Sequence, residues 1–253
     1  MKTKRVLCGL IAASFAAGSA SASIVDDFEG FSAGAFLVTG SSPWEFGDAA
    51  PGGPASNVID DGSGSNNVAE FQNASGTIFL TSAAATFADE GTVTVEFDFA
   101  TDDGAGSTDV SLGIGFVGAQ ANSAVNAGDI VAGIRLLPDN SIDARSAFGP
   151  FIETTGTWSE ETPHTVALVL DMVANEFDVL LDGSTIATGV AFASGFNSVG
   201  LDSFIVRPNA ANGNGTGSGQ TFFLDNITAV PEPASVMLLG AGAGLVALRR
   251  RSA

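Results

Sequence analysis

Short stretches of alternating apolar and polar residues recur along the chain and are separated by turns rich in glycine, asparagine and aspartate. In residues 92–100, valine and phenylalanine alternate with threonine, glutamate and aspartate. Because strand side chains point alternately to two faces, this predicts a half-buried strand. Comparable strands are predicted at 24–25, 36–39, 44–46, 58–59, 68–71, 77–81, 110–117, 130–137, 141–145, 148–154, 164–172, 176–181, 184–190, 199–206 and 221–228. Helical periodicity is missing, so we predict an all-β fold.

The segment from Trp158 to Val190 predicts a three-stranded meander. Asp182-Gly183 is a strong two-residue turn signal between the second and third of these strands. Many short strands at such spacing favour two packed sheets.

This meander and the closing stretch 222–227 resemble concanavalin-like or laminin-G-like jelly rolls. The resemblance is carried by Trp158 ahead of His-Thr-Val-Ala-Leu-Val-Leu at 164–170, by Phe-Asp-Val-Leu-Leu-Asp-Gly at 177–183, and by Phe-Phe-Leu-Asp-Asn-Ile at 222–227. It implies a jelly-roll β-sandwich over residues 23–229. Such families include lectin-like binders, adhesion modules and polysaccharide-cleaving enzymes.

The first 22 residues have the pattern of a signal peptide. A basic start at 1–5 precedes an apolar core at 6–17, and Ala20-Ser21-Ala22 predicts cleavage by signal peptidase after Ala22. The one cysteine, Cys8, would be removed with this segment. The exported chain therefore has no disulfide and no thiolate metal site.

Residues 230–253 have the pattern of a second targeting signal. Val230, Pro231, Glu232 and Pro233 precede an uncharged run at 234–248, and Arg249, Arg250 and Arg251 follow it. The run predicts a single apolar helix of about 22 Å, a marginal membrane span. Its basic end predicts that residues before Pro231 lie outside the cytoplasm.

This tail resembles the PEP-CTERM sorting domain of Gram-negative bacteria. The resemblance implies recognition by exosortase, a membrane protease-transpeptidase, usually in species that make exopolysaccharide. It also implies transient anchoring in the inner membrane through the apolar helix, followed by transfer to the outer envelope or the extracellular space.

The segment between the predicted signal peptide and the C-terminal tail is strongly acidic. Arg135, Arg145 and Arg207 are its only arginines or lysines, against 27 of the 28 acidic residues, so its formal charge is 3 − 27 = −24. Such a charge repels nucleic acid and anionic lipid and attracts cations. Solubility in a salty medium is the simpler explanation of the same composition.

Acidic side chains near both ends of this segment predict a structural calcium ion. We expect Asp26, Asp27, Glu29 and Asp225 to meet, because the first and last strands of jelly rolls often pair, and calcium prefers oxygen ligands. The acidic loops at 60–67 and 102–109 are alternatives. Ordinary polar turns would account for all of these residues without a metal.

Trp44 and Trp158 are the candidate sugar-stacking rings. The chain has no tyrosine, and most phenylalanines alternate along strands as core residues do. Stacking on a sugar needs an exposed ring, whereas a core role needs a buried one, and the sequence leaves both open.

Catalytic signatures are weak. Glu96 and Asp98 share a strand face, but the second glutamate found in laminarinase-type enzymes of this fold is absent. A zinc site or a Cys-His pair is excluded because His164 is the only histidine and no cysteine remains. A Ser-His-Asp triad would have to include His164, for which a structural role is the simpler interpretation.

These observations favour a non-enzymatic, exported β-sandwich that binds or organises polysaccharide in the envelope or extracellular matrix. One alternative is a polysaccharide hydrolase or lyase on the same fold. The other is a purely structural matrix protein.

Overall fold

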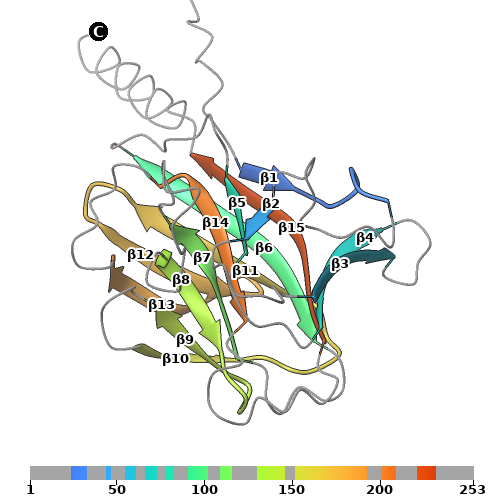
Figure 1. Ribbon diagram of the computed structural model, residues 1–253. Coiled ribbons are helices and arrows are strands. Elements are labelled where there is room, and N and C mark those ends of the chain that lie inside the picture. Colours follow the sequence, from blue (N-terminus) through green and yellow to red (C-terminus); the bar gives the residue numbers. More distant parts are fainter. Residues whose placement is uncertain are drawn as a thin grey trace, which may run out of the picture.

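The computed structural model describes residues 24–32, 44–46, 55–60, 66–72, 78–81, 91–101, 109–115, 130–145, 152–192, 201–208 and 221–231. These residues form fifteen strands in two antiparallel sheets and no helix (Figure 1). The predicted all-β sandwich is therefore confirmed. The predicted signal peptide, the strand at 36–39 and the tail from Glu232 onward lie outside the described residues.

One sheet has eight strands. Seven follow the order β13-β12-β11-β6-β15-β4-β3, and β1 also pairs with β15. The strands are β1 (Ile24–Asp26), β3 (Ala55–Asp60), β4 (Asn67–Gln72), β6 (Thr92–Thr101), β11 (His164–Asp171), β12 (Glu176–Leu181), β13 (Ser184–Ala191) and β15 (Thr221–Pro231).

The other sheet has seven strands in the order β10-β9-β8-β7-β14-β5-β2. They are β2 (Trp44–Phe46), β5 (Ile78–Thr81), β7 (Val110–Gly115), β8 (Ile130–Leu136), β9 (Ser141–Arg145), β10 (Ile152–Thr157) and β14 (Ser203–Pro208).

The last strand lies in the interior of its sheet. β15 pairs with β6 on one side, and on the other side with β4 over its first half and with β1 over its second half. The expected pairing of first and last strands is thus present, with Ile24 opposite Ala229. β15 continues to Pro231, opposite Val93, so the sheet extends into the first residues of the predicted tail.

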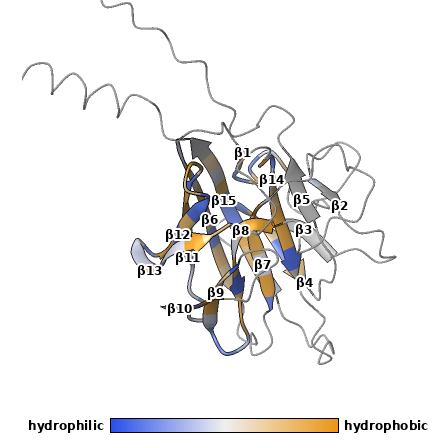
Figure 2. Cartoon of the chain, turned by 90° about the vertical axis from the view of Figure 1, so that its left-hand side faces the viewer, coloured by the Kyte–Doolittle hydropathy of each residue, from blue (hydrophilic) through white to orange (hydrophobic). Residues whose placement is uncertain are grey.

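Alternation along β6 divides the sandwich into a dry interior and a wetter outer face. Val93, Val95, Phe97 and Phe99 are buried, whereas Glu96 between them is exposed. Apolar residues of β8, β11 and β14 also lie in the middle of the sandwich (Figure 2). Phe97 meets Phe204 of the other sheet edge to face, with ring centroids 5.3 Å apart. The two sheets are therefore joined by interlocking aromatic side chains.

Two predicted strands are displaced in the structure. Residues 148–154 were predicted where β10 is Ile152–Thr157, and 199–206 where β14 is Ser203–Pro208. In both cases apolar residues just before the paired segment were included in the predicted strand. Alternation alone does not show where hydrogen bonding to a neighbouring strand begins. The predicted meander is confirmed as β11-β12-β13, with Asp182 and Gly183 both at positive φ in its turn.

In the part of the chain that the structure describes, no helix is long and apolar enough to span a membrane.

Replacing Phe97 with alanine should destabilise the protein by about 3–5 kcal/mol, because it removes a fully buried ring that joins the two sheets. Urea unfolding of the variant and the parent chain measures this difference. Val173→Ala is the control, since Val173 is 69% exposed and its truncation should change stability by less than about 0.5 kcal/mol. A Phe97→Ala loss as small as the control's would contradict the packing described above.

Candidate functional site

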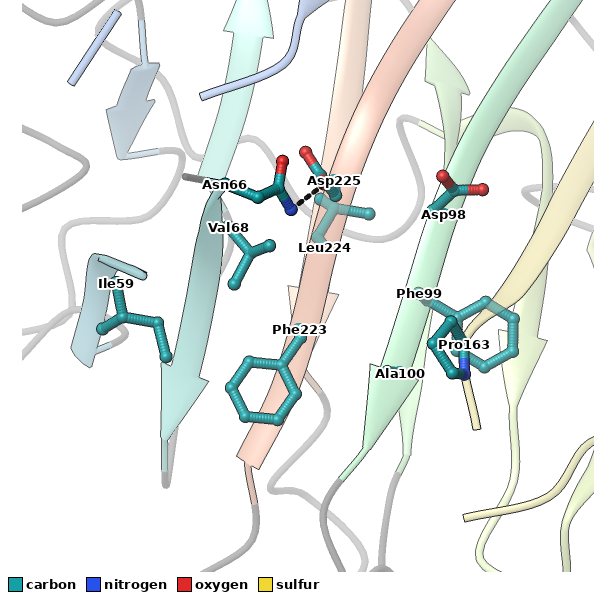
Figure 3. A pocket seen from close by; sticks show the side chains of 10 residues that line it. All are labelled: Ile59, Asn66, Val68, Asp98, Phe99, Ala100, Pro163, Phe223, Leu224 and Asp225. Atoms are coloured by element: carbon teal, nitrogen blue, oxygen red, sulfur yellow. Dashed lines mark hydrogen bonds between the residues drawn. The ribbon is translucent and has the colours of Figure 1, made fainter. Parts of the chain in front are cut away.

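A pocket of about 540 Å³ lies on the outer face of the eight-stranded sheet (Figure 3). Its outward-facing residues come from four neighbouring strands and alternate with core residues such as Leu224 and Phe99. This volume is within the range of pockets that hold small molecules. The pocket is lined by Ile59, Asn66, Val68, Asp98, Phe99, Ala100, Pro163, Phe223, Leu224 and Asp225.

Two carboxylates face each other across the central strand pair. Asp98 of β6 and Asp225 of β15 are directly opposite in the register. Like charges at such positions destabilise a sheet, so this pair needs compensating contacts or a functional reason.

A β-bulge supplies one of those contacts. Two residues of β15, Asn226 and Ile227, stand opposite the single residue Phe97, and Asn226 has a φ of 50°. Asparagine adopts this left-handed conformation more readily than most residues. The extra residue makes Asn226 exposed while Ile227 stays buried. The Asn226 amide nitrogen lies 2.8 Å from Asp98 Oδ2 and 3.3 Å from Asp225 Oδ2, so it donates to both carboxylates.

Further donors fix both carboxylates. The Thr165 hydroxyl donates to Asp98 Oδ1 at 2.6 Å. The Asn66 amide donates to Asp225 Oδ2 at 3.1 Å, and the Asn226 backbone N–H donates to Asp225 Oδ1 at 2.8 Å (Figure 3). Both acidic side chains are therefore held in place before any ligand arrives.

Electrostatics at the pocket raise the pKa of Asp225 above its ordinary value. Burial raises the pKa of Asp225, and the nearby charges of Asp98 and Glu29 raise it further. Hydrogen bonds from Asn66 and from the Asn226 backbone act in the opposite direction, but the pKa remains above its ordinary value of 3.8.

Apolar side chains form the rest of the pocket. Phe223 lies two residues before Asp225 on the same face of β15, and its partly exposed ring turns toward the pocket (Figure 3). Ile59 and Val68 lie beside it on β3 and β4. An aromatic ring next to fixed carboxylate and amide groups can bind a ligand with one apolar face and several hydroxyl groups.

The four residues predicted to bind calcium are not gathered into one group. Asp26 lies at the core edge, where its two oxygens accept hydrogen bonds from the Trp44 indole at 2.7 Å and from Phe28 N–H at 2.8 Å. Asp27 caps the Glu29 N–H, and Glu29 accepts from the Asn67 N–H at 2.7 Å. Among the described residues no cluster of three acidic or histidine side chains could hold a metal. Calcium binding stays a prediction.

Both tryptophans lie in the core, which corrects the proposal that they stack on sugar. Trp44 is 1% exposed and stacks on Phe28 with centroids 5.9 Å apart. Trp158 is 4% exposed and packs edge-on against Phe99 at 6.1 Å. Burial of a large ring is favourable on its own, and it leaves neither indole face open to a ligand.

His164 joins a Ser-His-Asp chain of contacts. Its Nδ1 lies 2.8 Å from Asp182 Oδ2, and its Nε2 lies 3.2 Å from Ser159 Oγ. However, Nε2 already accepts the Ser159 backbone N–H at 3.0 Å, so it is not available as a base for the hydroxyl. Burial acts to raise the pKa of Asp182, but hydrogen bonds from His164 and from the Thr165 N–H lower it overall. We interpret these hydrogen bonds as structural, because they fix the start of β11 to the turn that follows β12.

Sequence reasoning identified the two carboxylates but missed their neighbours. The sequence pattern places Asp98 on one strand face with Glu96 and suggests Asp225 as a calcium ligand, but it does not point to Asn66, Phe223 or Asn226. Phe223 looked like one of several core phenylalanines. The bulge that makes Asn226 exposed has no clear signal in the sequence beyond an asparagine inside a strand.

Comparison with family models identifies the tail. Residues 229–251 match the PEP-CTERM protein-sorting motif. The motif marks exported proteins of Gram-negative bacteria that are sorted by exosortase through a C-terminal membrane-anchoring signal. No curated protein is similar enough in sequence to count as a relative.

Comparison with solved structures identifies the sandwich fold. A sialidase matches 84% of this chain at a TM-score of 0.56 and 12% identity, but the match covers only 19% of that chain. A mutant Trypanosoma rangeli sialidase with trans-sialidase activity matches 71% of this chain and 28% of its own, at a TM-score of 0.50 and 17% identity. An alginate lyase mutant in complex with an alginate trisaccharide matches 85% of this chain and 100% of its own, at a TM-score of 0.52 and 11% identity.

At these identities the structural matches show the fold alone. The chain thus carries a PEP-CTERM sorting motif behind a β-sandwich shared with parts of sialidases and with an alginate lyase.

Asp225→Asn should stabilise the protein at pH 7 by roughly 0.2–1 kcal/mol, because it removes one of two opposed charges. A raised folded-state pKa means that ionisation of Asp225 opposes folding above that pKa. The gain should therefore shrink as the pH falls through that pKa and vanish below 3.8, the ordinary value. Thermal unfolding across pH 3–8 measures it, with exposed Glu96→Gln as the control. A gain that grows toward low pH would contradict this assignment.

Proposed function

We propose that the exported chain is a non-catalytic polysaccharide-binding β-sandwich of the cell envelope or extracellular matrix, and that the pocket on β6 and β15 is its sugar site. The observation that carries the proposal is a pocket that combines fixed hydrogen-bonding groups with an accessible aromatic ring. A sugar ring offers the complementary surface, because its hydroxyls donate to carboxylates and its C–H face packs on an aromatic side chain.

The charges of the pocket favour a neutral sugar. Asp98 and Asp225 would repel a carboxylate or sulfate group at close range, whereas hydroxyl groups can donate to their oxygens. Asn66 and Asn226 add amide groups that can donate or accept. Because these four side chains already hold one another, little conformational entropy is lost when a sugar binds.

The sorting motif indicates the cellular location at which this binding would occur. We propose that exosortase processes the tail at the inner membrane and that the sandwich then reaches the outer envelope or the extracellular matrix, where exopolysaccharide is its partner. Since β15 continues to Pro231, the sandwich would lie close to the membrane surface before processing. The acidic body makes nucleic acid an unsuitable partner.

A polysaccharide hydrolase or lyase is the second candidate, and one observation favours it. Asp98 and Asp225 face each other across adjacent strands, and the raised pKa of Asp225 would suit a general acid beside a second carboxyl group. We prefer a non-catalytic, sugar-binding role, because side chains already donate hydrogen bonds to oxygens of both carboxylates. In a hydrolase or lyase, these same oxygens would have to contact the sugar at the bond that is cleaved. A purely structural matrix protein would need no such pocket.

Binding is tested with the full-length chain and the exopolysaccharide of its own host, followed by size-exclusion chromatography with light scattering. We expect co-elution at unchanged polymer mass. Asp98→Asn and Phe223→Ala should each weaken binding by about tenfold or more, since each removes a direct contact with the sugar. Glu96→Gln is the matched control, because Glu96 is exposed on the same strand and does not line the pocket.

Two results would overturn the proposal. A falling polymer mass would identify the hydrolase or lyase, and independent elution of protein and polymer would leave a structural role. Melting temperatures near that of the parent chain show that a variant has lost binding rather than folding.

A further inference from the structure

The outer face of the other sheet carries a polar row that crosses five strands. The register places Arg207 of β14 opposite Ser111 of β7, Ser111 opposite Arg135 of β8, Arg135 opposite Asp143 of β9, and Asp143 opposite Glu153 of β10. At a strand spacing of about 4.8 Å, the row is about 19 Å long.

All three arginines of the acidic segment between the predicted signal peptide and the tail lie on this face. Arg145, in the next row of β9, lies opposite Gly133, and its guanidinium donates to the Ser111 hydroxyl. Around them three acidic side chains, Asp109, Asp143 and Glu153, balance the formal charge of the three arginines. The centre of the row is buried, with Ser111 0% exposed, so a ligand would contact the partly exposed Arg145 and Arg207 at its edges.

The charged groups of this face are held in place. Arg135 forms a two-pronged ion pair with Asp109, with Nε–Oδ1 and Nη2–Oδ2 distances of 2.7 and 2.6 Å. Asp109, Ser111 and Asp143 are all less than 9% exposed although they face away from the inter-sheet core. Burying charged groups costs free energy, and ionisable groups in such surroundings occur both at functional sites and in structural ion-pair networks.

The row beside the charged one has no side chains at its centre. It runs Ile205, Gly113, Gly133 and Arg145. A Cβ atom at Gly113 would lie 2.2 Å from the Ala132 carbonyl oxygen, and one at Gly133 would lie 2.2 Å from the Leu112 carbonyl oxygen. The close approach of β7 and β8 therefore requires glycine at both positions.

The lowered pKa of Arg145 agrees with a site for a negatively charged group of a ligand. Burial, together with the neighbouring charges of Arg135 and Arg207, lowers the pKa of Arg145 to about 10. A bound carboxylate would relieve this repulsion. Arginine also matches a carboxylate in a planar, bidentate geometry that lysine does not offer.

We propose that this face is a second glycan site, which binds acidic polysaccharides whose sugars carry carboxylate groups. Arg145 and Arg207 bind the sugar carboxylate, while Asp143 accepts hydrogen bonds from its hydroxyls. A uronic acid ring carries both kinds of group and so matches a row in which two arginines are followed by two acidic side chains. The site lies on the opposite sheet from the pocket and is independent of it, so the sandwich can bridge two polysaccharide chains.

The test uses the full-length chain with polygalacturonate and with the same polymer after complete methyl esterification, which keeps the sugar backbone and removes its charge. Affinities are measured by calorimetry at low and at moderate salt. We expect binding to the acidic polymer that is at least about tenfold tighter than to the ester and that weakens with added salt. Equal binding to both polymers, or to neither, would overturn the proposal.

Variants separate the two glycan sites. Arg207→Gln should weaken binding to polygalacturonate by about tenfold, whereas Asp98→Asn in the pocket should leave it unchanged. Glu153→Gln, at the exposed end of the row, should strengthen binding, because it removes a negative charge near the ligand. This variant still tests the proposal if Arg207→Gln does not fold, and weaker binding in Glu153→Gln would contradict it.

Discussion

The antiparallel pairing of β6 with β15 is the contact on which the rest of the molecule depends. It joins the last strand of the sandwich to the middle of the chain, and β4 and β1 are connected to β6 in the sheet only through β15. The inner face of this pair supplies Phe97 and Leu224 to the core, while the outer face supplies Asp98 and Asp225 to the pocket. One strand pair therefore serves both stability and the proposed function, and the opposed carboxylates reduce stability at the place where the ligand would bind.

We propose that the two outer faces of the sandwich, which differ in chemistry, each bind a polysaccharide. On the eight-stranded sheet, carboxylates and amides surround an accessible phenylalanine and suit a neutral sugar. On the seven-stranded sheet, arginines share a row with acidic residues and suit a sugar with its own negative charge. A molecule that holds one polysaccharide on each face would organise a matrix without any catalytic step, which agrees with a sorting motif that directs the chain out of the cell.

Much of the fold could be predicted from the sequence, because alternation is a local property. The strand at Thr92 and the meander around Asp182-Gly183 were recognised from their own residues. The site was harder, since it depends on which strands become neighbours. Asp98 and Asp225 are far apart in sequence, and nothing local shows that they stand opposite each other. The same holds for the arginine row, whose members come from separate strands, and for Trp44 and Trp158, whose burial depends on packing rather than on their neighbours in sequence.

Hydrogen exchange of the full-length chain, followed by mass spectrometry with and without oligosaccharides from the host's exopolysaccharide, tests the central claim most directly. The sugar site described here requires slower exchange in peptides that cover 97–101 and 222–228, because a bound sugar would stabilise the outer face of the central strand pair. Unchanged exchange in both peptides at saturating oligosaccharide would contradict the assignment of this pocket as the site of polysaccharide binding.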